Sequence, residues 1–156
     1  MRVTARPVPT VVAGLSVALA LGGCGMATRA KSVAVIDGHA ISEAELETVR
    51  TQFGEAFGQQ LTSSQTLDAL LVAPFVVDYV TATKKWAPDA AYADNLAKLS
   101  NPDPLTVTLL KYAMAQNTTQ LGQADVATIL GKLRAANIQV NPRFGNFVIG
   151  NDGLGL

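Results

Sequence analysis

Apolar residues recur at the spacing of an α-helix over the stretch that follows Ile41. The stripe consists of Leu46, Val49, Phe53 and Phe57. Ser42 and Glu45 stand just before it in the arrangement of a capping box, in which each side chain accepts a hydrogen bond from the backbone amide of the other residue. Together the cap and the stripe predict a helix over residues 43–60.

A longer helix is predicted after a cap at Thr62, Ser63 or Ser64. Its centre, residues 70–77, is apolar nearly all round, which is typical of the buried central helix of a bundle. Pro74 has no backbone N–H to donate, so we expect it to bend this helix.

Three further helices are predicted in the second half of the chain. A short one covers the apolar positions between residues 92 and 99. Asp103 and Pro104 form a cap and first-turn pair for the next helix, which we expect to end at Gly122. The last is predicted over residues 124–136, and its inner face consists of Val126, Ile129, Leu130 and Leu133.

The period changes at both ends of this helical region. Residues 33–36 form a short β-branched run, followed by the turn signal Asp37-Gly38. Residues 138–149 alternate apolar and polar positions around Pro142. Because no neighbouring segment is long enough to stabilise the first strand, we expect it to pair with the last. The predicted fold is mostly α, a small bundle of about five helices, with a short N-terminal strand paired with a C-terminal strand or extended arm.

The start of the chain has the pattern of a secretory signal. Arg2 and Arg6 precede an apolar run over residues 11–21, which is about half of the roughly 20 residues that a spanning helix needs. The sequence that follows, Leu21-Gly22-Gly23-Cys24, resembles the lipobox of bacterial lipoproteins. The resemblance implies cleavage between Gly23 and Cys24 and a diacylglyceryl group on the Cys24 sulfur. The alternative is an ordinary signal peptide with a chance cysteine.

Two or more acyl chains anchor a protein stably, whereas one holds it only marginally. We therefore expect a lipid-anchored protein on the extracytoplasmic face of the cell membrane. The sequence does not distinguish the cytoplasmic membrane from an outer membrane. The expected organisation is a signal peptide over residues 1–23, a lipidated tether over 24–32, the helical domain over 33–150 and a flexible tail over 151–156.

Composition and residue types exclude several functions. Twelve basic and twelve acidic residues balance, so no basic footprint for nucleic acid is present. His39 is the single histidine and is interpreted as a solvated turn residue. Cys24 and His39 do not make a metal-ligand set, and the carboxylates are scattered. We expect no enzyme activity, no catalytic residue, no cofactor and no metal.

The segment "NPRFG" places Arg143 and Phe144 directly after a proline. One interpretation is a structural turn in which Arg143 pairs with a helix carboxylate. The other is an exposed edge at which Arg143 and Phe144 contact a polypeptide.

Two motifs carry a resemblance that covers the chain after the lipobox. They are "DG-x-x-IS-x-x-E" at residues 37–45 and "VNPR-aromatic-G" at residues 140–145. With the lipobox, they resemble actinobacterial lipoproteins with a SurA N-terminal-like domain, relatives of the chaperone SurA and of the trigger-factor and PrsA foldases. The family's closing motif commonly continues into a segment with a tryptophan, whereas Phe147 stands at about that place here and Trp86 lies elsewhere.

The resemblance implies chaperone-like binding of unfolded or newly exported polypeptides without energy or cofactor. Many relatives also carry a prolyl isomerase domain, which we do not expect here. The alternative is an envelope adaptor that binds one specific folded partner. If the domain has a binding concavity, we expect it between the first, second and fourth predicted helices.

Overall fold

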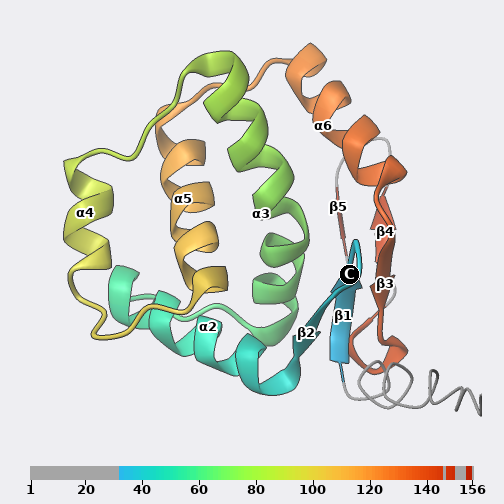
Figure 1. Ribbon diagram of the computed structural model, residues 1–156, viewed down its shortest axis with the longest axis horizontal. Coiled ribbons are helices and arrows are strands. Elements are labelled where there is room, and N and C mark those ends of the chain that lie inside the picture. The colour runs from blue at the N-terminus through green and yellow to red at the C-terminus, as the bar shows by residue number, and fades with distance from the viewer. Residues whose placement is uncertain (1–31, 146, 150–153, 156) are drawn as a thin grey trace, which may run out of the picture.

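The computed structural model describes residues 32–145, 147–149 and 154–155 of the chain. Cys24, the lipobox and nearly all of the expected tether lie outside the described residues. The five helices in the described part are α2 (Glu43–Phe57), α3 (Ser63–Lys84), α4 (Ala90–Leu96), α5 (Pro104–Thr118) and α6 (Gln123–Ala135). The strands are β1 (Ser32–Ile36), β2 (His39–Ser42), β3 (Ile138–Val140), β4 (Val148–Ile149) and β5 (Leu154–Gly155), and a 3₁₀ turn, η1, spans Pro142–Phe144. Figure 1 shows the helices around α3 and the strands to one side, which confirms the mostly α prediction.

β1 is the central strand of an antiparallel sheet with the order β2-β1-β3. Its pairing with β3, which joins Val35 to Gln139, confirms that the first strand meets the C-terminal region. The expectation that β1 lacks a local partner is wrong, because β2 pairs with it across the Asp37-Gly38 turn. A hairpin alone is marginal, but β3 supports the other side of β1, so this hairpin is not isolated.

The capping box of α2 is present. Ser42 Oγ accepts from the Glu45 amide at 3.1 Å, and Glu45 Oε2 accepts from the Ser42 amide at 2.8 Å. The helix ends earlier than predicted, since Gly58 takes a left-handed conformation (φ 70°) and its N–H donates to the Gly54 carbonyl at 2.8 Å. Glycine adopts this conformation without the penalty that a Cβ atom brings, which explains the stop at this position.

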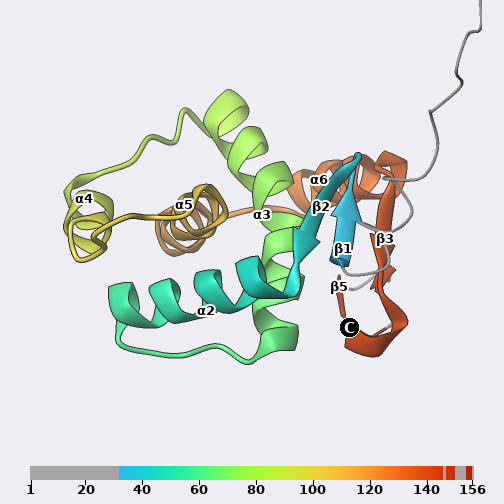
Figure 2. The ribbon, with the colours of Figure 1, turned by 60° about the horizontal axis from the view of Figure 1, so that its bottom comes forward.

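α3 is the central helix, as its apolar pattern predicts. Thr62 is its N-cap, and Leu67 and Leu71 are fully buried. One face of α3 packs with α2, α4, α5 and the sheet, and a second face packs with α6. The views in Figures 1 and 2 agree that α6 lies on the side of α3 opposite to α4.

Two predictions in the second half of the chain are wrong. Gly122 does not end α5, which stops at Thr118; it is the N-cap of α6. Val126 is not part of the core, since 41% of it is exposed. Gly122 N–H donates to Asp125 Oδ2 at 2.8 Å, so α6 begins here. Val126 shares the helical face of Ile129, Leu130 and Leu133 but stands in the first turn of α6, before the part of that face that is buried.

Asp125 also joins α6 to α3. Its Oδ1 accepts from the Tyr79 hydroxyl at 2.6 Å, and its Oδ2 lies 2.8 Å from Lys84 Nζ. Hydrogen bonds from the Lys84 ammonium, which has the largest effect, and from the Tyr79 hydroxyl and the Gly122 amide lower the pKa of Asp125 from its usual value of 3.8 to about 2. The native state therefore favours the ionised carboxylate.

We expect Asp125→Asn to lower the midpoint of thermal unfolding by a few degrees at pH 6. Because the folded pKa lies below the unfolded one, the ionised Asp125 stabilises the fold fully above about pH 4, and this contribution is lost as the pH falls towards 2. The check is thermal unfolding of both proteins from pH 6 to pH 2. The gap between the two midpoints should shrink below pH 4; a gap that is constant with pH would contradict the assignment.

Candidate functional site

A cleft of about 510 Å³ opens between α2, α3 and α5. We call it the helical cleft. It lies between the first, second and fourth of the predicted helices, where a concavity was expected. Its lining residues are Phe53, Leu61, Gln65, Asp68, Ala69, Val72, Leu109, Tyr112, Ala113 and Gln116.

The floor of the helical cleft is apolar. Phe53 of α2, Val72 of α3 and Leu109 of α5 are buried there. Ala69 and Ala113 stand on α3 and α5, and their short side chains leave space that longer ones would fill. The Phe57 ring stacks on Phe53 with the centroids 4.6 Å apart, which stabilises one wall.

The rim of the helical cleft is polar and mostly uncharged. The Gln65 side chain caps the start of α3, where its Oε1 accepts a hydrogen bond from the Thr62 amide at 3.0 Å. Gln116 Nε2 donates to the Tyr112 hydroxyl at 2.7 Å. Burial, with a smaller effect of the Asp68 charge, raises the pKa of Tyr112, so this phenol stays neutral at physiological pH. These three side chains therefore offer hydrogen bonds, and Asp68 supplies a carboxylate to the same lining.

A second hollow of about 460 Å³ lies between the β1–β2 hairpin, α3 and the start of α5. We call it the hairpin groove. Its lining residues are Ile36, Asp37, His39, Ile41, Leu70, Pro74, Phe75, Asp78, Leu105 and Thr108. Sequence patterning did not identify this groove, because the partner strand β2 was not predicted.

His39 lies at the start of β2, is exposed and lines the hairpin groove. It therefore lies beside the predicted turn, and its side chain makes no hydrogen bond to another described residue. The acidic residues in the groove lining are Asp37 and Asp78. Among the residues that the structure describes, no Ser, Thr or Cys is hydrogen-bonded to the imidazole, which is the contact that activates a nucleophile beside a histidine.

Arg143 and Phe144 lie in η1, away from both hollows. Arg143 is exposed, and its guanidinium carbon lies 6.0 Å from the centre of the Phe144 ring. Phe144 is half-buried against the main core. The turn is held by Asn141, whose Oδ1 accepts from the Arg143 amide at 3.1 Å. Polypeptide contact at Arg143 and Phe144 stays a prediction.

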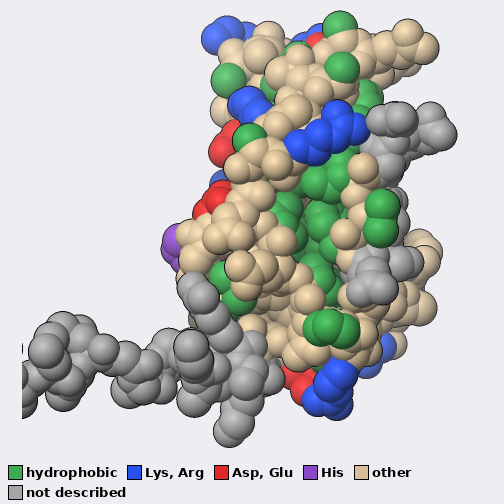
Figure 3. Space-filling view, turned by 90° about the vertical axis from the view of Figure 1, so that its right-hand side faces the viewer, with side chains coloured by type: hydrophobic (Ala, Val, Ile, Leu, Met, Phe, Trp, Pro, Cys, Tyr) green, Lys and Arg blue, Asp and Glu red, His purple; other side chains and the backbone are tan. Residues whose placement is uncertain are grey.

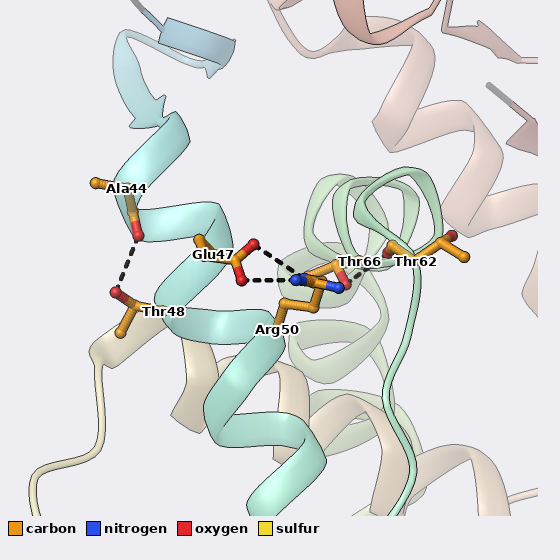
Figure 4. Close-up of polar contacts among 6 residues, drawn as sticks. All are labelled: Ala44, Glu47, Thr48, Arg50, Thr62 and Thr66. Atoms are coloured by element: carbon orange, nitrogen blue, oxygen red, sulfur yellow. Dashed lines mark hydrogen bonds and ion pairs between the residues drawn. The ribbon is translucent and has the colours of Figure 1, made fainter.

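Several polar contacts along α2 and at the start of α3 are made within one helical turn. Arg50 donates two hydrogen bonds to the exposed Glu47 carboxylate, from Nη2 to Oε1 at 2.6 Å and from Nε to Oε2 at 3.0 Å (Figure 4). Thr48 and Thr66 each donate to the carbonyl four residues before, Ala44 and Thr62 respectively, at 2.9 Å (Figure 4). Such contacts within one turn contribute little to stability and gather no reactive groups.

Within the described ranges, no three His, Cys, Asp or Glu side chains are grouped so that they could hold a metal ion. α3 is long and apolar enough to cross a membrane by composition, but half of its most apolar window is buried inside the fold. That burial is typical of a core helix. Compared with known protein families, with curated proteins and with solved structures, the chain gives no match.

Proposed function

We propose that this protein binds unfolded or newly exported polypeptides through the helical cleft, while lipid on Cys24 holds it at the extracytoplasmic face of a membrane. The observation that carries the proposal is the open apolar cleft between three helices. Its volume of about 510 Å³ falls within the range of roughly 300–1,000 Å³ that binding sites occupy. The SurA-like motifs and the lipobox support the same interpretation.

The chemistry of the cleft fits a transient apolar guest. Buried Phe53, Val72 and Leu109 offer contact with aliphatic or aromatic side chains. The exposed amide of Gln116 can exchange hydrogen bonds with a guest backbone. A site of this kind recognises many sequences weakly, because apolar contact is non-directional.

The test fills the cleft. We expect the natural protein, in vesicles of a zwitterionic lipid, to suppress aggregation of a chemically denatured client that is diluted into buffer. Ala113→Leu should occupy space above the floor and weaken client binding about tenfold, which corresponds to about 1.4 kcal/mol. Light scattering follows aggregation, and anisotropy of a labelled client measures affinity.

The matched control is Ala124→Leu, the same change at an exposed helical position of α6. It should leave suppression unchanged, and circular dichroism should show both variants folded. Equal suppression by all three proteins would contradict the cleft as the binding site. No suppression by the natural protein, together with recovery of one stoichiometric folded partner from membranes, would favour the adaptor instead.

A further inference from the structure

The hairpin groove lies beside an open edge of the sheet. β2 is the outermost strand in the order β2-β1-β3, and Figures 1 and 2 both show it as the strand closest to α3. An open strand edge offers unpaired backbone groups to another extended chain. A groove next to such an edge can therefore hold a backbone and a side chain at once.

The register identifies which backbone groups face the open edge. Asp37 N donates to Asn137 O, and Asn141 N donates to Val33 O, so the odd-numbered residues of β1 bond towards β3. The even-numbered ones bond towards β2, where Ile36 meets His39. Because pairing alternates along an antiparallel strand, Ala40, which is exposed, directs its N–H and C=O away from β1.

The groove changes character along its length. Ile41, Leu70 and Leu105 line it where β2 runs into α2, and they are buried or half-buried. Asp37 and Asp78 line it towards the hairpin turn, and both are exposed. Figure 1 shows α3 beginning near the β2–α2 junction and ending beyond the turn, so its residues follow the same order.

Charge complementarity defines what fits the acidic end. No Lys or Arg lines the groove, and neither Asp37 nor Asp78 forms an ion pair with another described residue. Asp37 Oδ1 accepts from the Asn137 amide at 2.9 Å, which fixes this carboxylate beside the turn. His39 is the other titratable side chain in the lining. A guest with an ammonium or guanidinium group would meet two carboxylates here.

Pro74 interrupts the backbone hydrogen bonding of α3 beside the groove. It has no N–H, so the helical bond that residue 74 would donate to the Leu70 carbonyl cannot form. Leu70 and Pro74 both line the groove. The turn of α3 that lacks this bond therefore lies along the groove.

The geometry points to a second polypeptide site, in which an extended segment pairs with Ala40 on the β2 edge and places an apolar and a basic side chain, two positions apart, in the hairpin groove. The guest residue opposite Ala40 points away from the groove, so its two neighbours point in. In antiparallel pairing, the apolar neighbour lies beside Ile41 and precedes the basic one, which lies beside His39. This inference rests on the proposed function only in that the ligand is polypeptide.

The test uses seven-residue peptides with Leu-Thr-Lys at the centre and with Leu-Thr-Glu as the matched acidic control. Binding to the full natural protein in zwitterionic nanodiscs is measured by calorimetry, with empty nanodiscs as the blank. We expect the basic peptide to bind at least tenfold more tightly than the acidic one. N-methylation of the central Thr, which removes the donor facing Ala40, should lower affinity at least tenfold. Equal affinities, or no effect of N-methylation, would overturn the inference.

Two protein variants complete the test. Asp78→Asn should weaken binding of the basic peptide about three- to fivefold, whereas the control Asp94→Asn on α4, also exposed, should leave it unchanged. An equal effect of both variants would point to general charge and overturn the site. Ala113→Leu in the helical cleft should leave peptide affinity unchanged. A loss of client binding in that variant with peptide binding intact separates the failure of one site from the failure of the other.

Discussion

Leu67→Ala is expected to lower the free energy of unfolding by about 2–5 kcal/mol. Leu67 is fully buried on α3, in the core shared by α2, α5 and the sheet. Alanine has the higher helix propensity, so the loss reports the cavity and the missing contacts rather than the helix itself. Unfolding in urea, followed by circular dichroism at 222 nm, measures the change as a lower midpoint with an unchanged slope.

Val126→Ala is the matched comparison, because it also shortens an aliphatic side chain on a helix. Val126 is 41% exposed, so its truncation should change stability by less than about 0.5 kcal/mol. Similar losses for both variants would mean that Val126 is buried in the folded protein and that its exposure described above is wrong.

Cys24→Ser is expected to move the protein from the membrane fraction to the soluble fraction. The lipobox predicts that the Cys24 sulfur carries the diacylglyceryl group, and a serine hydroxyl does not replace it. Each buried methylene contributes about 0.8 kcal/mol to anchoring, so losing both chains removes nearly all of the affinity. Cell fractionation with immunoblotting measures the change.

The control for this experiment is Gly25→Ser, which alters the neighbouring residue and leaves Leu21, Gly22, Gly23 and Cys24 intact. It should stay with the membrane. Membrane association of Cys24→Ser, or a natural protein whose mass shows an unmodified thiol, would contradict lipidation at this position.

Caps and apolar stripes in the sequence predicted the helices well, but they did not predict the strand β2 or the role of Gly122. The cap at Ser42 and the stripe after it depend on residues within one or two turns, so the sequence determines them directly. β2 was missed because His39–Ser42 is too short to show a period and is stabilised by β1, which in turn depends on β3 about a hundred residues away. Gly122 was misassigned because glycine occurs at either end of a helix, and the side chain of Asp125 decides between them.

The position of the helical cleft could be predicted, but its lining could not. The order and apolar faces of the helices indicate that α2, α3 and α5 surround one core. Whether Ala69 and Ala113 leave a hollow or are covered depends on how far apart two packed helices lie, and residue spacing carries no information on that distance. The hairpin groove depends on a strand that was not predicted, so no pattern pointed to it.

The position of β1 in the sheet also decides how the domain responds to mechanical load. β1 begins at Ser32, the last residue of the expected tether. Its start is held by Asn141, whose amide donates to Val33 O at 2.9 Å and whose Nδ2 donates to Ser32 O at 3.2 Å. Tension from a bilayer anchor would act along a strand that is bonded on both sides, so these bonds would share the force in shear rather than break one after another. A protein tied to a moving lipid surface would thus be pulled along a strand that is hydrogen-bonded to two neighbours.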